Sequence, residues 1–154
     1  MLDLLMHLGL SPARIAMVHA GATWFMVGLI WFVQIVHYPL FQRVPEAACA
    51  RYALHHQRRT TWVVGPVMLV EALSALVLIV SPPPAPSGAF LAWTGASVLG
   101  LIWLSTFFVQ VPLHDYLARQ FDAGACRRLV ITNWVRTTLW TVRGVLALSL
   151  LGPV

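Results

Sequence analysis

Two long stretches without a charged side chain constrain this sequence more than any other feature. Residues 15–42 contain no Asp, Glu, Lys or Arg, and residues 60–114 contain only one, Glu71. Uncharged apolar runs longer than about 18 residues are typical of membrane-spanning helices. Only 10% of the residues are charged and 59% are hydrophobic, whereas a soluble domain carries about 25% charged residues. We therefore expect an integral membrane protein.

The hydropathy pattern predicts four membrane-spanning helices, at about residues 15–38, 61–80, 90–113 and 129–151. Ser11 and Pro12 precede the first span, and they are typical of a helix N-cap and a first helical residue. Residues 1–10 are apolar and compatible with a segment lying flat on the membrane surface. No basic region precedes the first apolar run, so we expect no cleavable signal peptide. The expected fold is an all-α four-helix membrane bundle forming one domain, residues 1–154.

The three connectors between the spans differ in charge. Residues 81–88 form a short uncharged link, whereas the other two connectors are long and rich in arginine. The arginines are Arg43, Arg51, Arg58 and Arg59 in one connector, and Arg119, Arg127 and Arg128 in the other. Because arginine excess marks the cytoplasmic side, we expect both charged loops in the cytoplasm and both termini outside a plasma or inner membrane. Cys49 and Cys126 lie in these loops and are expected to stay reduced.

The second half of the chain repeats parts of the first half at a shift of 77 residues. His37 aligns with His114 and Cys49 with Cys126, and residues 59–61 and 136–138 share the sequence Arg-Thr-Thr. We therefore predict two tandem two-span repeats, about residues 15–80 and 90–151, related by an axis along the membrane normal.

Polar residues on the predicted helix faces point to one pocket near the cytoplasmic side. Helical spacing places His37 and His114 at the inner ends of the first and third spans. His56 and Asn133 occupy matched positions where the second and fourth spans begin, and two arginines follow one turn deeper. The residues that we expect to line this pocket are His37, His56, His114, Asn133, Arg59, Arg136, Gln34, Gln110, Thr106, Trp103 and Trp140.

Three chemistries fit this set of side chains. The imidazoles of His37, His114 and His56 could ligate a transition metal or a haem iron. Arg59 and Arg136 could hold carboxylates, such as haem propionates or an acidic substrate. The imidazoles could also serve acid–base catalysis on a bound quinone or phenol, with Asn133 beside them as a further catalytic residue. The simpler interpretation is that interfacial His and Arg side chains contact lipid headgroups. The sequence contains no specific metal motif such as HExxH or a paired CxxC.

A second polar cluster is expected toward the outer face. Glu71 is the only acidic residue inside a predicted span, His19 lies in the outer half of the first span, and Arg143 is the deepest arginine. Because an unpaired carboxylate at that depth is costly, we predict that Glu71 pairs with Arg143, with His19, or with both. This cluster is either a buried structural pair or a proton or ion site.

Three segments, WFVQIVHYPLF, FVQVPLHDYLARQFD and NWVRTTLWTVRG, resemble the anthrone-oxygenase-like family of small four-span membrane proteins. In that family a polar residue precedes a Pro-Leu-Asn step at the end of span three, and a Trp and Asn/Arg-Thr element opens span four. The matching residues here are Gln110, Pro112, Leu113, Asn133, Trp134, Arg136 and Thr137. His114 stands where an asparagine is common. The resemblance implies oxidation of a phenolic or quinone-like substrate.

Two classes of function follow from these features. The first is a small membrane oxidoreductase or oxygenase-like protein that binds a haem, a metal or an aromatic, quinone-like ligand. The second is a non-enzymatic membrane subunit or small transporter module that acts in a homo-oligomer or a larger complex. The formal charge of +5 does not indicate nucleic-acid binding, because no arginine-rich run with interleaved aromatics forms an exposed face. The lipid bilayer is the expected environment in both cases.

Overall fold

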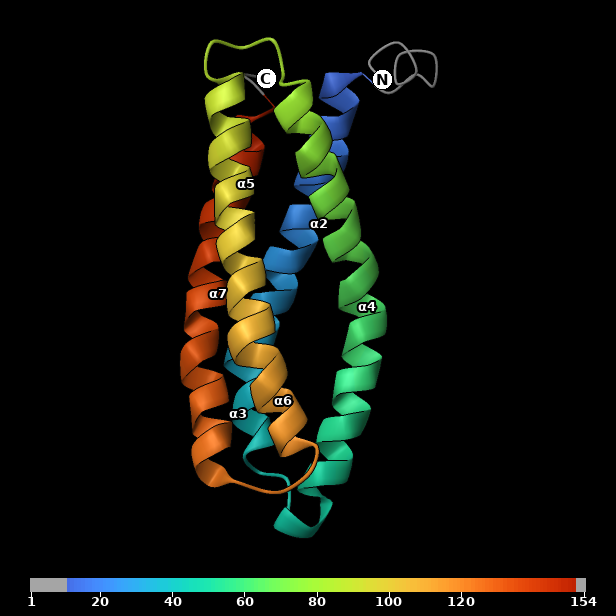
Figure 1. The fold of residues 1–154 in the computed structure, drawn as a ribbon, viewed down its shortest axis with the longest axis vertical. Helices are drawn as coiled ribbons and strands as arrows, with labels where there is room; N and C mark the ends of the chain where they lie inside the picture. The colour runs from blue at the N-terminus through green and yellow to red at the C-terminus, as the bar shows by residue number, and fades with distance from the viewer. Residues whose placement is uncertain (1–10, 152–154) are drawn as a thin grey trace.

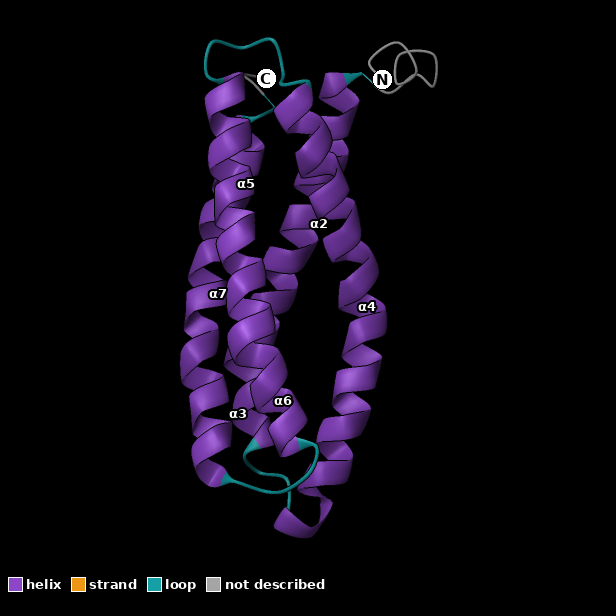
Figure 2. Cartoon of the chain, in the orientation of Figure 1, coloured by secondary structure: helices purple, strands orange, loops and turns teal. Residues whose placement is uncertain are grey.

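The structure, a computed structural model, describes residues 11–151, and the predicted surface segment at residues 1–10 lies outside this range. The described chain is helical and contains no strand (Figures 1 and 2), which confirms the predicted all-α fold. In chain order the elements are α2 (Pro12–Phe32), η1 (Val33–His37), α3 (Tyr38–Phe41), α4 (Glu46–Val80), α5 (Gly88–Ser105), η2 (Thr106–Gln110), α6 (Val111–Leu117) and α7 (Ala123–Ser149).

Three of the four long helical units are long and apolar enough to cross a membrane. They are Pro12–Phe41, Glu46–Val80 and Gly88–Leu117. The fourth unit, α7, does not meet the same criterion; it contains four arginines, at positions 127, 128, 136 and 143. The prediction of a membrane-type helical bundle is therefore supported for three spans, and the fourth span stays a prediction.

The helices form a four-membered ring in which α2 and α5 each pack against both α4 and α7. No Cα atom of α4 lies within 8 Å of a Cα atom of α7, and α2 and α5 are separated in the same way. The first and last described residues lie at one end of the bundle with the loop at residues 81–87 (Figure 1). The loops at residues 42–45 and 118–122 lie at the opposite end, which we call the two-loop end.

Two helix starts differ from the sequence prediction. Helix α4 begins at Glu46 and α7 at Ala123, so the arginines at 51, 58, 59, 127 and 128 lie in helices and not in loops. Residues 46–60 contain no glycine or proline, and nothing in their backbone chemistry ends a helix there. The arginine-rich stretches are therefore polar parts of α4 and α7 and not loops.

The two cysteines were also predicted in loops, and this prediction was wrong. Cys49 lies in α4 and Cys126 in α7, and both are buried in a core with Tyr38, Phe41 and Leu117. Because α4 and α7 keep their Cα atoms more than 8 Å apart, a disulfide between these thiols would require the backbone to move. The cysteines therefore act as small packing residues in this structure.

Other local features match the sequence. The Ser11 side chain accepts a hydrogen bond from the Arg14 N–H, and Pro12 stands in the first turn of α2, which confirms the predicted cap. At the start of α7, Asp122 accepts a hydrogen bond from the Ala125 N–H. These side chains satisfy amide groups that have no partner within the helix.

Each half of the chain contains one π-helical turn. The N–H of Tyr38 bonds to the carbonyl of Val33, and the N–H of Val111 bonds to the carbonyl of Thr106. A proline follows each donor, at positions 39 and 112, and proline supplies no N–H of its own. Turns of this kind rotate the side chains that follow them and are frequent at functional sites.

Candidate functional site

A cavity of about 460 Å³ lies between α4 and the η2–α6 segment and is backed by α2. Most of its wall is apolar, with Met26, Ile30, Val64 and Met68 among the lining side chains. Its polar lining residues include Tyr38, His56, Gln110, His114, Trp103 and Arg136. Figure 1 shows α4 diverging from α5 and α6 over this part of the bundle.

The cavity reaches the surface of the bundle between α4 and η2–α6. Four of its lining side chains, Thr61 and Leu69 on α4, Phe107 on η2 and Val111 on α6, are exposed. Three of these four rim residues are apolar, so the opening suits an apolar environment better than water.

Tyr38 and His114 form a hydrogen-bonded pair in the cavity wall. The Tyr38 hydroxyl oxygen lies 2.9 Å from His114 Nε2, and the tyrosine is only 3% exposed. When the hydroxyl donates to Nε2, the imidazole carries its proton on Nδ1. This Nδ1 is buried and has no hydrogen-bond partner. The pair can therefore exchange a proton internally.

The three histidines predicted as metal ligands come together, but the rings of His37 and His56 stack on each other. The His37 and His56 ring centroids are 4.3 Å apart with an interplanar angle of 26°, and the His56 and His114 centroids are 5.4 Å apart. His56 Nδ1 lies 3.1 Å from the Thr60 hydroxyl. Among residues 11–151, no group of three His, Cys, Asp or Glu side chains is arranged to hold a metal ion. The metal and haem predictions thus gain no support from the geometry.

Arg136 brings a buried positive charge to the same wall. It is 8% exposed, its Nη1 donates to Asn133 Oδ1 at 3.3 Å, and its guanidinium carbon lies 5.2 Å from the centre of the Trp140 ring. Asn133 in turn donates to Gln34 Oε1 at 2.9 Å. The predicted residues Asn133, Gln34 and Trp140 therefore lie behind the cavity and hold Arg136 in place.

Several lining residues carry buried polar atoms without a hydrogen-bond partner. They are Trp103 Nε1, Gln110 Oε1, His114 Nδ1 and Arg136 Nε, and His37 Nε2 is unpaired nearby. Because the Gln110 amide nitrogen donates to Thr132 Oγ1 at 3.0 Å, its oxygen is left on the unpaired side. Buried polar groups in folded proteins almost always have partners, so a concentration of unpaired ones around a cavity indicates a place for a ligand.

The structure separates Arg59 from the pocket, leaves His37 outside the lining residues of the cavity, and adds Tyr38. Arg59 is exposed and does not line the cavity, so the predicted pair of Arg59 and Arg136 does not form. The cavity face of α4 carries His56 and Thr60, and the side chain at position 59 points about 100° away from that of Thr60. Tyr38 was not predicted as a site residue. Its spacing of four residues from Gln34 could have indicated the shared face.

The remaining predicted site residue, Thr106, does line the cavity, but its hydroxyl donates to the Ile102 carbonyl at 2.8 Å. Its polar group is thus already paired within the helix, so it presents its methyl group more readily than its hydroxyl.

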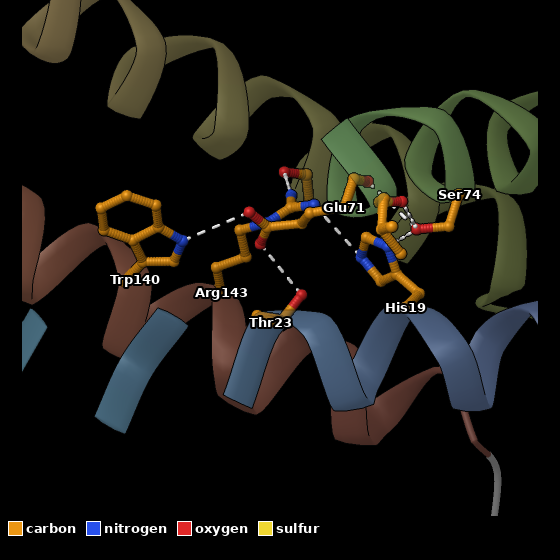
Figure 3. Close-up of polar contacts among 8 residues, drawn as sticks. His19, Thr23, Glu71, Ser74, Trp140 and Arg143 are labelled. Carbon is orange, nitrogen blue, oxygen red and sulfur yellow. Dashed lines mark hydrogen bonds and ion pairs between the residues drawn. The ribbon is translucent and has the colours of Figure 1, made fainter. Parts of the chain in front are cut away.

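The second polar cluster is a buried network around Glu71 (Figure 3). Arg143 Nε lies 2.6 Å from Glu71 Oε1, which confirms the predicted ion pair. The same carboxylate accepts hydrogen bonds from the Thr23 hydroxyl at 3.0 Å and from Trp140 Nε1 at 3.4 Å. Glu71 is fully buried and Arg143 is 1% exposed.

Arg143 extends this network to the other helices. Its guanidinium also donates to the Gly95 carbonyl on α5 and to His19 Nε2, which lies 3.1 Å away on α2. A guanidinium has no acceptor, so His19 Nε2 is unprotonated and Nδ1–H donates to Ser74 Oγ at 2.8 Å. No polar atom of these side chains is left unpaired. The complete pairing across all four helices favours the structural interpretation of this cluster.

Comparisons with protein-family models, with characterised proteins and with solved structures found no match to the chain. Nothing in these comparisons places it in the anthrone-oxygenase-like family, and that resemblance stays a hypothesis.

Proposed function

We propose that this protein is a small membrane oxidoreductase, oxygenase-like in character, that binds an aromatic or quinone-like molecule in the cavity between α4 and η2–α6. The observation that carries the proposal is the cavity of about 460 Å³, with apolar walls and a group of buried, unpaired polar atoms in its lining residues. Sites for small organic ligands are commonly apolar with a few polar groups that fix orientation.

In this proposal all four helical units cross the bilayer, with the two-loop end in the cytoplasm. The exposed rim at Thr61, Leu69, Phe107 and Val111 then faces lipid, and the ligand enters sideways from the membrane. The two π-helical turns, one in each half of the chain, support a tandem repeat of two-span units.

The chemistry proposed for the chain is proton handling at a ligand oxygen. Tyr38 and His114 are joined by a hydrogen bond of 2.9 Å. The pair can supply a proton to the bound ring or accept one from it. The apolar wall excludes water from the same oxygen, which strengthens each hydrogen bond made there. The electrons of a redox reaction would come from or pass to a second substrate.

Binding can be tested with a neutral probe, 2-methyl-1,4-naphthoquinone, added to the purified protein in detergent. We expect saturable quenching of tryptophan fluorescence, because Trp103 lines the cavity, and a smaller quenching amplitude in Trp103→Phe. Gly65 also lines the cavity, and a Cβ atom added there meets nothing within 4 Å. Gly65→Leu should therefore fill the cavity and weaken binding.

The matched control is Gly100→Leu, because Gly100 also has open space around it but does not line the cavity. Thr61→Phe at the rim provides a second block, and circular dichroism verifies that each variant stays helical. Unsaturable quenching, or equal affinity in the blocked and control variants, would contradict the proposal and favour a non-enzymatic subunit or transporter module.

A further inference from the structure

The buried guanidinium of Arg136 lacks a negatively charged partner. Among residues 11–151, no Asp or Glu oxygen lies within 4.0 Å of it. Its contacts are the Asn133 side-chain oxygen, the Trp140 ring and the neighbouring Tyr38 hydroxyl. By contrast Arg143, seven residues further along the same helix, is paired with Glu71. The same helix therefore holds one compensated and one uncompensated buried cation.

An unpaired charge in this position is expensive. Burying an ion without a counter-ion costs several kcal/mol even after relaxation, and the Nε–H of Arg136 also lacks a hydrogen-bond acceptor. The neighbouring neutral groups offset only part of this cost, since a cation–π contact contributes about 0.5–2 kcal/mol. A ligand with a negative charge at the cavity wall would supply the counter-ion.

The depth of Arg136 limits which anion can do this. Arg136 is 13 residues from the first residue of α7, Ala123, and 13 from the last, Ser149. At 1.5 Å per residue it lies about 20 Å from either end of the helix. Arg136 also lines the cavity, whose rim opens between α4 and η2–α6, so an apolar anion that enters the cavity reaches the guanidinium.

The unpaired polar atoms of the cavity wall agree with an oxygen-bearing anion. Trp103 Nε1 and Arg136 Nε are obligatory donors, and His114 Nδ1 is a donor when Tyr38 donates to Nε2. Only Gln110 Oε1 is an acceptor. Each of these atoms exposes less than 1 Å², so they act on a ligand through their partial charges, and an excess of donors favours an anion.

We propose that the cavity selects a planar apolar acid in its anionic form, such as a deprotonated hydroxyquinone or phenol, with Arg136 as its counter-ion. This inference rests on the proposed function, because it names the class of ligand for the same cavity. Arg136 binds the anion, and Asn133 and Trp140 act as positioning residues that hold the guanidinium.

Two quinones of nearly the same shape test the inference. The neutral probe is 2-methyl-1,4-naphthoquinone, and the anionic probe is 2-hydroxy-1,4-naphthoquinone, which is ionised at neutral pH. We expect the anion to bind about 10- to 100-fold more tightly, the range of one charge-assisted hydrogen bond. Arg136→Gln should remove this preference, so that the two probes bind with similar affinities. Arg59→Gln is the matched control, because Arg59 is exposed and does not line the cavity.

Further measurements separate the outcomes. In the wild type, affinity for the hydroxyquinone should fall as the pH drops below the pKa of the ligand, whereas affinity for the neutral probe should stay constant. This pH test uses only the wild type, so it remains valid if Arg136→Gln does not fold. Equal affinities for the two probes would overturn the charge preference and leave the proposed function standing, whereas binding of neither probe would refute the proposed function itself. Displacement of the hydroxyquinone by equimolar phosphatidylglycerol would assign the site to a lipid headgroup and overturn the inference.

Discussion

Replacing Glu71 by glutamine should destabilise the bundle strongly although the side chain keeps its shape. The substitution removes the carboxylate that pairs with Arg143 at 2.6 Å in a fully buried position. Arg143 keeps its bonds to the Gly95 carbonyl and to His19, but it loses its counter-ion. Breaking one partner of a buried ion pair costs about 3–5 kcal/mol.

The hydrogen bonds of the network add to this cost. The glutamine oxygen can still accept from Arg143 and from Thr23, which lies 3.0 Å from the same carboxylate oxygen in the wild type. The amide nitrogen then faces Trp140 Nε1, and two donors meet where a donor met an acceptor. An unpaired buried donor costs about 1–3 kcal/mol. Because the two penalties share the same atoms they do not add fully, and we expect a total of about 3–5 kcal/mol.

Equilibrium unfolding in mixed micelles, followed by circular dichroism, measures this free energy, and the melting temperature should fall by about 10 °C. Glu46→Gln is the control, because Glu46 is exposed in the first turn of α4, and it should change stability by less than about 1 kcal/mol. The double variant Glu71→Leu with Arg143→Met should be more stable than Glu71→Gln alone, because no unpaired charge remains.

This explanation would be refuted if Glu71→Gln lowered the free energy of unfolding by less than about 1 kcal/mol, because a buried guanidinium that loses its carboxylate should cost more than that. It would also be refuted if the double variant were less stable than Glu71→Gln. That result would mean that the cost lies in the shape of the side chains and not in the charge of Arg143.

Two further predictions concern the ends of the helices. In Gly88→Ala the new Cβ would press against the backbone carbonyl of Pro83, so we expect lower stability. In Gly100→Ala the new Cβ meets open space, and the free energy of unfolding should rise by about 0.5–1 kcal/mol. The same unfolding assay compares the two variants, and equal shifts would contradict this account. At the start of α7, the Ala125 N–H lowers the pKa of the Asp122 carboxyl from its usual 3.8. Since the folded state favours the ionised form, this stabilisation is present above the ordinary pKa and is lost as the pH falls through the lowered one. Any advantage of the wild type over Asp122→Asn should therefore begin to shrink below about pH 4, and melting temperatures measured from pH 3 to pH 7 would show whether it does.

The sequence alone determined the helical class of the fold and the pairs that long-range chemistry requires. Uncharged stretches of membrane-spanning length predict helices, because a backbone without access to water must bond to itself. Ser11 and Pro12 fixed one helix start through local capping. Glu71 was paired correctly with Arg143 because a single buried carboxylate must find a cation at a similar depth.

The sequence did not determine where polar helices begin or which way their side chains turn. Helix α4 starts at Glu46 and not near residue 61, since polarity alone does not end a helix. Arg59 and Arg136 share the sequence Arg-Thr-Thr, but only Arg136 is buried. A repeat in sequence therefore did not ensure equal environments, because each helix is rotated by its own neighbours.

Only the tertiary structure decided the site itself. The π-helical turn at Val33–His37 and the divergence of α4 from η2–α6 bring Tyr38, His114 and Arg136 to one cavity. A hydropathy pattern reports how much apolar surface a helix carries, averaged over its faces, and it cannot report the gap left where two helices fail to meet. That gap depends on the packing of all four helical units together, and so does the position of an arginine that is buried without a counter-ion.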